Sequence, residues 1–138
     1  MIILDTNVLS ELMKSQPDKS VVRWIGEHQA TSLFITTLTQ AEILYDLEIL
    51  PAGKRCTALK KEAKAMFELD FAGRILPFDT KAAQLFATIV AERKKIGRPI
   101  SQIDAQIAAI TRSHNATLAT RNVDHFEECG IEIINPWE

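Results

Sequence analysis

The sequence contains little cysteine, glycine or proline, and it has no long apolar run. Two cysteines, Cys56 and Cys129, lie far apart, unlike paired metal ligands or redox motifs, so both are expected to be free thiols. Five glycines and five prolines among 138 residues exclude a collagen-like or low-complexity chain. No apolar segment approaches the ~18 residues of a membrane-spanning helix. The N-terminal segment MIILD lacks the basic residues of a signal peptide, which predicts a cytoplasmic protein.

An excess of one charge is also absent. Sixteen basic and 18 acidic residues give a net charge of −2, so bulk electrostatics do not indicate a nucleic-acid binder. Binding to nucleic acid would need a local basic patch. The hydrophobic share of 46% and the charged share of 25% are those of an ordinary globular chain. The length predicts one domain over residues 1–138.

Strand and helix patterns alternate along the chain. Strands are expected at residues 2–4, 32–36, 74–78, 116–120 and 131–134. Helices are expected at residues 8–14, 21–28, 39–50, 54–71, 80–96 and 101–114, with a short one at 123–129. Asp79 is the expected N-cap of the helix at 80–96, whose apolar stripe is expected to be Ala83, Phe86, Ala87, Val90 and Ala91. This order predicts a three-layer α/β/α domain with a mostly parallel sheet of about five strands.

Four polar residues from distant segments are predicted to share one edge of that sheet. Asp5 ends the first strand, and Glu42 lies in the expected first turn of the helix after the second strand. Asp104 lies in the first turn of the helix that leads into the strand at 116–120, and Asn122 follows that strand. Because ligands of parallel sheets bind beyond the carboxyl ends of the strands, these residues are candidates for one site.

Helix capping is the alternative explanation for each of these acids. Thr39 and Glu42 have the spacing of a capping box, and Ser101 and Asp104 come close to it. Asp5 is placed to cap the first helix. The order of elements therefore permits an acidic cluster without proving one.

Energetics limit what a cluster of Asp5, Glu42 and Asp104 would require. At a separation of roughly 5 Å, each pair of carboxylates repels by about 3 kcal/mol at an effective dielectric near 20. Three such pairs would rival the stability of a whole domain, so the ionised cluster would need a cation. Carboxylate ligands favour Mg²⁺ or Mn²⁺ over zinc.

Several segments around these acids are similar to motifs of one known family. The opening segment, ILDTNVLSE at 3–11, resembles that of PIN-domain proteins, and most of all the toxin ribonucleases of the VapC type in their FitB-like branch. TQAE at 39–42 resembles the second motif of this family, and GRPI at 97–100 with DAQIAA at 104–109 resembles its third motif. ATRNVDHF at 119–126 resembles the fourth motif of the family, and INPW at 134–137 resembles its C-terminal tail. RILPFD at 74–79 resembles the middle of FitB-like chains.

The resemblance implies a role for each matched residue. It implies metal ligation by Asp5, Glu42 and Asp104, and these three with Asn122 would be the catalytic residues. The family often has an aspartate at the position of Asn122, so Asp124 is an alternative ligand. The supporting residues that it implies are Thr6, Asn7 and Thr120.

The resemblance also implies a reaction. The chain would be an Mg²⁺-dependent endoribonuclease that hydrolyses RNA phosphodiesters, as the toxin of a type II toxin–antitoxin system. The candidate RNA contacts are basic residues close to the acidic site: Arg93, Lys94, Lys95, Arg98 and Arg121. For the basic stretch from Arg93 to Arg98, the alternative is a solvated helix end, where cations are favoured.

The partners implied by the resemblance are a small antitoxin, which neutralises the toxin, and a second copy of the chain. Operator DNA would be bound only through the antitoxin, in a higher oligomer. The tail of the antitoxin would lie in an apolar groove of this chain. The candidate residues of that groove, with ordinary core packing as the alternative, are Leu12, Trp24, Leu44, Tyr45 and Phe67. A non-catalytic regulatory subunit that acts with a DNA-binding antitoxin on its operator is the alternative function, slightly favoured by the amide of Asn122.

Overall fold

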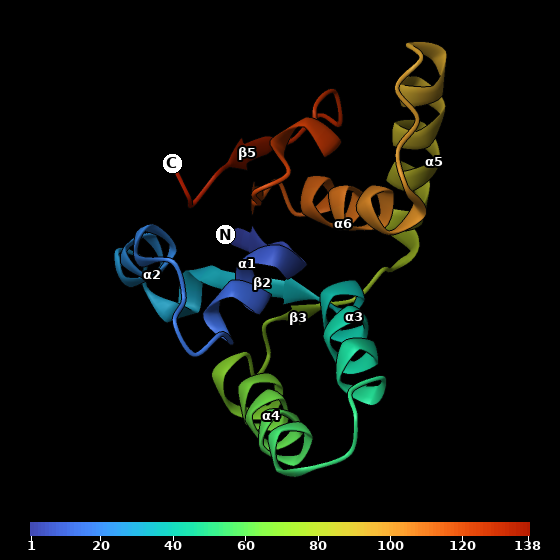
Figure 1. The fold of residues 1–138 in the computed structure, drawn as a ribbon. Helices are drawn as coiled ribbons and strands as arrows, with labels where there is room; N and C mark the ends of the chain where they lie inside the picture. Colours follow the sequence, from blue (N-terminus) through green and yellow to red (C-terminus); the bar gives the residue numbers. More distant parts are fainter.

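Five short strands form one parallel sheet at the centre of the structure (Figure 1). The computed structural model describes residues 1–138. The strands are β1 (Ile2–Leu4), β2 (Leu33–Thr36), β3 (Ile75–Leu76), β4 (Thr117–Ala119) and β5 (Glu132–Ile134). Their order in the sheet is β3-β2-β1-β4-β5. All four neighbouring pairs are parallel, so the predicted parallel sheet of about five strands is confirmed.

Six α-helices surround this sheet, as the three-layer prediction requires (Figure 1). They are α1 (Thr6–Leu12), α2 (Lys19–Gly26), α3 (Thr37–Glu48), α4 (Lys54–Ala65), α5 (Thr80–Lys95) and α6 (Gln102–Ser113). A π-helical turn, Met66–Asp70, continues α4, and the short helix expected at 123–129 is a single 3₁₀ turn, η3 (Val123–His125). None of the helices has the length and apolar character that a membrane crossing demands.

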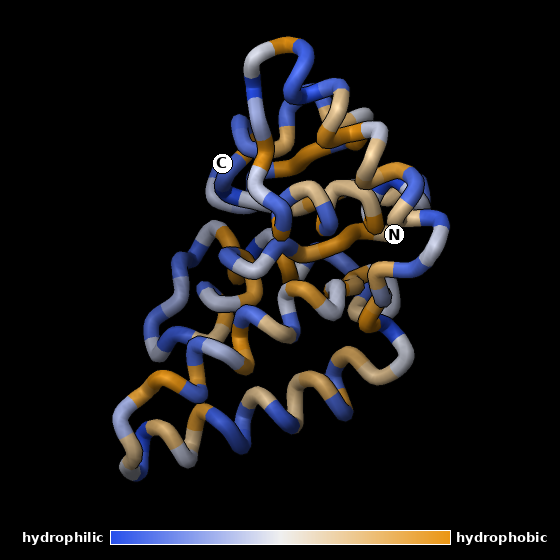
Figure 2. Tube along the Cα trace, turned by 90° about the vertical axis from the view of Figure 1, so that its right-hand side faces the viewer, coloured by the Kyte–Doolittle hydropathy of each residue, from blue (hydrophilic) through white to orange (hydrophobic).

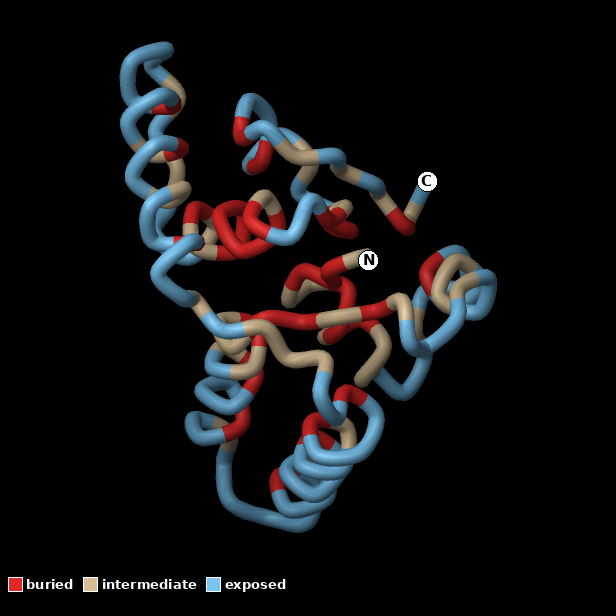
Figure 3. Tube along the Cα trace, turned by 180° about the vertical axis from the view of Figure 1, so that it is seen from behind, coloured by how far each residue is buried: buried red, intermediate tan, exposed pale blue.

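The core is divided between the two faces of the sheet. Ile3 and Leu4 are neighbours in β1, yet they belong to separate apolar clusters because successive strand residues point to opposite faces. Hydrophobic residues run along the central strands (Figure 2), and β1, β2, β4 and α6 are the most continuously buried parts of the chain (Figure 3). A strand buried on both faces explains why β1 lacks alternation in its sequence. Cys56 and Cys129 are buried free thiols, as predicted.

Side-chain caps set where the helices begin. Asp5 accepts the backbone N–H of Thr6 at 2.8 Å, so α1 starts two residues earlier than predicted. Thr36 Oγ1 accepts the N–H of Thr39 at 3.2 Å and begins α3 at Thr37. The capping box expected at Thr39 and Glu42 is therefore wrong, and Glu42 lies in the second turn of α3, not the first.

The buried face of α5 also differs from the expected stripe. Asp79 caps this helix through the N–H of Ala82 at 3.0 Å, as predicted. The buried positions, however, are Ala82, Ile89 and Arg93. Of the predicted stripe, Phe86 and Val90 are half-buried, while Ala83, Ala87 and Ala91 are exposed. The helix is thus rotated relative to the prediction because an arginine, which a search for apolar residues passes over, occupies a core position.

Candidate active site

Asp5 lies at the carboxyl end of the central strand and is only 5% exposed. Its Oδ1 accepts the N–H of Thr6, and its Oδ2 accepts the hydroxyl of Thr120 at 2.7 Å and the amide of Asn7 at 3.2 Å. Burial raises the pKa of the Asp5 carboxyl, the Thr120 and Thr6 hydrogen bonds lower it, and the negative charges of Asp104 and Glu42 raise it, with a net upward shift. Asp5 is thus both a helix cap and a buried carboxylate with no cationic partner.

Asn7 connects the segment after β1 to the segment after β4. Its Nδ2 lies 3.3 Å from the Thr120 hydroxyl, and its Oδ1 accepts the N–H of Arg121 at 3.2 Å. The structure therefore places Asn7 and Thr120 around Asp5, where the resemblance expected supporting residues. These bonds fix the Asp5 carboxylate by neutral donors, which leave its charge uncompensated.

Glu42 approaches the same edge from α3. Its Oε1 accepts the Thr6 hydroxyl at 2.6 Å, and that hydroxyl also lies 3.0 Å from the hydroxyl of buried Thr39. Two helices that follow neighbouring strands are thereby joined beside Asp5. Glu42 and Thr6 lie at the site, as predicted, while Thr39 is an additional supporting residue.

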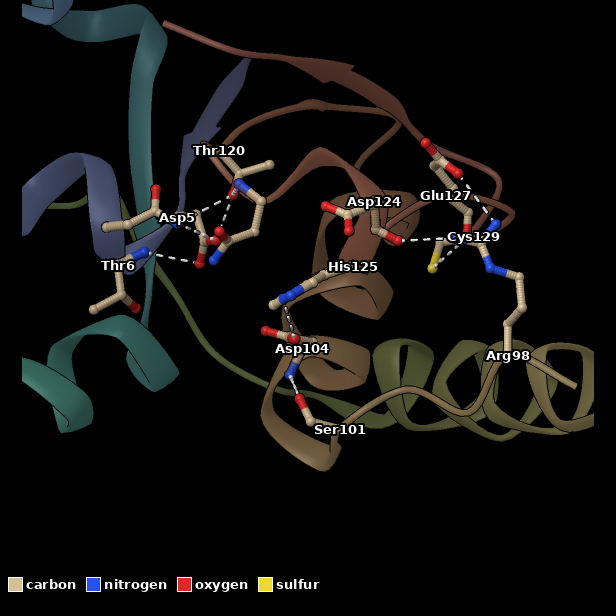
Figure 4. A network of polar contacts seen from close by, with 12 residues as sticks. Asp5, Thr6, Arg98, Ser101, Asp104, Thr120, Asp124, His125, Glu127 and Cys129 are labelled. Atoms are coloured by element: carbon tan, nitrogen blue, oxygen red, sulfur yellow. Dashed lines mark hydrogen bonds and ion pairs between the residues drawn. The ribbon is translucent and has the colours of Figure 1, made fainter. Parts of the chain in front are cut away.

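Asp104 comes from the first turn of α6. Its N–H donates to Ser101 Oγ at 3.2 Å, so Ser101 caps the helix as predicted. The Asp104 side chain does not complete a capping box. Its Oδ2 lies 3.4 Å from Nδ1 of His125, and Figure 4 shows these two side chains facing each other next to the Asp5 network.

The three acids share the predicted edge, but they do not form a closed cluster. No three histidine, cysteine or carboxylate side chains of the chain are arranged as a complete metal-ligand set. Asp5, Glu42 and Asp104 are therefore not arranged as such a set, and the Asp104 carboxylate contacts His125. The groups that Asp5, Glu42 and Asp104 offer are carboxylate oxygens, a ligand type suited to a hard cation.

The fourth position is less defined. The Asn122 side chain is exposed and forms no hydrogen bond within the protein, although its backbone N–H donates to Thr120 Oγ1 at 3.1 Å. Asp124 lies in η3, and its carboxylate likewise has no hydrogen bond or ion pair. The geometry brings neither residue into the Asp5 network by a side-chain contact.

Comparison with known proteins places this arrangement in a family. Residues 2–131 match the family described as PIN domain. The chain belongs to the PIN-domain family. It is 41% identical to VapC ribonuclease Y4jK of Sinorhizobium fredii and 36% identical to Toxin FitB of Neisseria gonorrhoeae, with 99% or more of each chain covered. This confirms the resemblance found in the sequence.

Solved structures agree with this PIN-domain assignment. The crystal structure of FitAcB from Neisseria gonorrhoeae superposes with a TM-score of 0.95 at 36% identity, covering all of this chain and 99% of the other. DNA-bound VapBC from Salmonella typhimurium superposes with a TM-score of 0.79 at 27% identity, covering 98% and 97%.

The basic residues of this PIN domain fall into two groups. Lys94 and Lys95, at the end of α5, and Arg121, after β4, are exposed and available to a polyanion. Arg98 is half-buried and pairs with Glu127 at 3.1 Å. These four stay candidate RNA contacts.

The prediction that Arg93 contacts RNA is wrong, because this residue is only 4% exposed and its side chain bonds within the protein. Its Nε donates to the carbonyl of Arg98 at 2.6 Å, and its Nη1 donates to the carbonyls of His125 and Glu127. It is therefore a clamp between the loop before α6 and the η3 segment, not a surface contact for RNA. No apolar pattern in the sequence marks this role.

The candidate groove residues also divide. Leu44 and Tyr45 are exposed on α3, whereas Leu12 and Trp24 pack against the core beside α1 and α2. Phe67 is a buried core residue, so the alternative of ordinary packing holds for it. His125, which contacts Asp104, was not among the residues that the sequence predicted for the site.

Proposed function

We propose that this PIN domain is a metal-dependent endoribonuclease that acts as the toxin of a toxin–antitoxin pair. The observation that carries the proposal is Asp5, a buried carboxylate without a cationic partner, facing the charges of Glu42 and Asp104. Relatives that align over nearly the whole chain are named ribonuclease, and another is named tRNA(fMet)-specific endonuclease VapC of Salmonella typhimurium.

Mg²⁺, or Mn²⁺ in its place, is the cofactor that this donor set suits. Asp5, Glu42 and Asp104 would hold the ion, and an open arrangement is compatible with Mg²⁺, which keeps several waters and uses one or two carboxylates. When bound, the ion polarises the scissile phosphate and lowers the pKa of an attacking water. Thr6 and Thr120 hold the carboxylate oxygens of Glu42 and Asp5 in fixed orientations for it.

Three exposed basic residues bind the RNA. Lys94, Lys95 and Arg121 supply cationic contacts for phosphates on either side of the acidic edge, which offsets the net charge of −2 locally. Arg121 is itself held by a cation–π contact, its guanidinium carbon 5.1 Å from the centre of the Trp137 ring. The side chain that aims this cation is therefore fixed before RNA arrives.

A cognate antitoxin is the proposed partner, in the cytoplasm. Structures of relatives include FitAB bound to the IR36 DNA fragment, at 36% identity to this chain. By analogy, the chain would assemble as a homodimer with its antitoxin, and the antitoxin would contact operator DNA.

A purely regulatory subunit is the second candidate function. Asn122 favours it, because an exposed amide adds no charge to the acidic edge. The regulatory hypothesis predicts operator binding with the antitoxin and no cleavage of RNA by the free chain.

One experiment separates these two functions. Purified protein free of antitoxin is incubated with pooled tRNA, rRNA and mRNA in Mg²⁺, in Mn²⁺ or in EDTA. Cleavage is expected only with metal, and it should be lost in Asp5→Asn and Asp104→Asn but kept in Glu92→Gln, a change at an exposed α5 position. Cleavage that survives in EDTA or in Asp5→Asn would contradict the proposal, and folded protein that never cuts would favour the regulatory function.

A further inference from the structure

A hollow of about 230 Å³ adjoins the acidic edge. The loop before α6, the η3 turn and Arg93 of α5 surround it, and Asp104 lines it. Its volume corresponds to about eight water molecules at ~30 Å³ each, enough for one planar base. Because Asp104 belongs to both places, an occupant of the hollow would neighbour the phosphodiester bound at the acidic edge. The inference that follows rests on the proposed ribonuclease function.

Arg93 supplies a buried hydrogen-bond donor to this hollow. Its Nε and Nη1 are used by backbone carbonyls, whereas Nη2 has no acceptor within the protein. No fully buried side-chain nitrogen or oxygen lacks a partner, so Nη2 is not sealed in the interior. Since Arg93 lines the hollow, this amino group is available to a carbonyl oxygen of an occupant.

The walls of the hollow suit a flat ring. Pro99 and Ile100 contribute apolar surface, and the His125 side chain, which is 53% exposed, contributes an aromatic one. Nδ1 of the imidazole lies 3.4 Å from Oδ2 of Asp104, and about half of the side chain stays open to an occupant. Aromatic and imidazole rings of this kind stack on unpaired RNA bases.

Hydrogen-bond acceptors complete the lining. Asp124 uses its backbone carbonyl to accept Arg98 Nη2 at 3.2 Å, but its carboxylate has no partner. Ser101 Oγ accepts the N–H of Asp104, so its own hydrogen remains free to donate. The hollow therefore offers an acceptor at Asp124 and donors at Arg93 and Ser101.

The charge of the lining selects among parts of a nucleotide. Two carboxylates, Asp104 and Asp124, outweigh the single guanidinium of Arg93, which disfavours a phosphate and favours a neutral base. The base that best satisfies both Arg93 and Asp124 has a carbonyl oxygen and an exocyclic amino group, because the ring N–H of uracil lies between two carbonyl oxygens that the Asp124 carboxylate repels. Guanine and cytosine carry both, adenine lacks the carbonyl, and uracil lacks the amino group.

We propose that this hollow binds the guanine or cytosine base of the nucleotide next to the scissile phosphodiester. Asp124 accepts from the amino group of the base, and Arg93 Nη2 donates to its carbonyl. His125 stacks on the ring. The hollow thus determines which phosphodiester bonds the ribonuclease cuts, whereas Asp5, Glu42 and Asp104 are needed for cleavage itself.

Matched RNA oligonucleotides test this assignment. Two sets differ only in the nucleotide before or after the cleaved bond, and kcat/KM is measured with Mg²⁺. Guanine or cytosine at one of these positions is expected to raise kcat/KM about tenfold or more over adenine and uracil. Asp124→Ala and His125→Ala, checked for folding by circular dichroism, should each reduce the preference to less than about threefold. Glu92→Gln, the matched control, should keep it.

Different results would contradict base binding in the hollow and the proposed ribonuclease function. Cleavage without a base preference, or a preference that Asp124→Ala leaves intact, would overturn the hollow and leave the ribonuclease standing. If the wild type cuts no RNA, the ribonuclease fails, and the His125 ring signal in NMR decides the hollow. Metal-free protein is then titrated with GMP, CMP, AMP and UMP. A shift with GMP or CMP alone would support base binding, and an equal or absent response to all four would overturn it.

Discussion

The hydroxyl of Thr6 donates a hydrogen bond of 2.6 Å to Oε1 of Glu42, and this bond joins the start of α1 to the second turn of α3. A hydroxyl carries one proton, so Thr39 must supply the proton in its 3.0 Å contact with Thr6. Glu42 is therefore oriented through a chain of two hydroxyls, with no ion pair to hold it. A carboxylate aimed in this way stays free to receive a cation.

Replacing Thr6 by valine tests this chain of hydroxyls. Thr6→Val keeps the shape of the side chain but removes the donor, so we expect metal activation to weaken by about 10–100-fold. Thr6→Ser restores the hydroxyl and should recover most of the loss. The measurement is the Mg²⁺ concentration that gives half-maximal cleavage. An unchanged activation curve in Thr6→Val would show that the bond is dispensable.

The raised pKa of Asp5 predicts how the stability of the metal-free protein depends on pH. Burial, and then the charges of Asp104 and Glu42, raise this pKa above the ordinary 3.8, despite the Thr120 and Thr6 hydrogen bonds. The folded chain thus binds the proton more tightly than the unfolded chain. The contribution of Asp5 to the free energy of unfolding falls as pH rises from 3.8 through the raised pKa, and it stays low above that pKa.

Urea unfolding of the wild type and Asp5→Asn isolates this effect. The free energy of unfolding of the wild type, minus that of the variant, is expected to decrease from about pH 4 to about pH 8. The subtraction cancels other groups, including Glu11, whose pKa is lowered by its bonds to Lys14 and to the N–H of Asp18. A difference that is flat or that rises with pH would contradict the prediction.

Metal binding should raise the thermal midpoint of the wild-type protein. At 100 times its dissociation constant, Mg²⁺ would add about 2.7 kcal/mol to the free energy of unfolding. Asp5→Asn and Asp104→Asn should lose most of this gain, and Glu92→Gln should keep it. Differential scanning calorimetry with Mg²⁺ and with EDTA measures the gain. Equal stabilisation of all four proteins would place the ion elsewhere.

Arg93 is expected to matter for stability more than any exposed cation of α5. Arg93→Met removes three part-buried hydrogen bonds from a charged donor to backbone carbonyls, and hydrogen bonds to charged groups contribute ~1.5–3 kcal/mol each. A total loss of at least about 3 kcal/mol is therefore expected from chemical denaturation. Lys95→Met changes an exposed neighbour and should stay within about 0.5 kcal/mol. Similar values for the two variants would contradict the clamp.

The parts of the fold that depend on apolar patterning could be predicted from the sequence. The run at 2–4 reads as a buried strand, and β1 occupies those residues at the centre of the sheet. The face of α5 could not be found in this way, because Arg93 holds a core position through carbonyl bonds that no pattern encodes. The start of α3 was misplaced because three threonines, Thr36, Thr37 and Thr39, compete as caps, and tertiary packing decides among them.

The candidate site was predictable to the same depth. Topology alone brings Asp5, Glu42 and Asp104 to one edge, since parallel strands end together. The separations within that edge depend on rotamers, and Asp104 takes the one that faces His125. The hollow beside it requires three segments to meet, which spacing in a sequence does not reveal.

The bond between Asp5 and Thr120 spans 115 residues of the chain. During translation, Asp5 leaves the ribosome long before β4, the strand that pairs with β1 on one side, has been made. A nascent polypeptide therefore carries its acids long before it has the scaffold that gathers them. If this protein cuts RNA, the growing chain would stay harmless to its own message at least until Thr120 has been made.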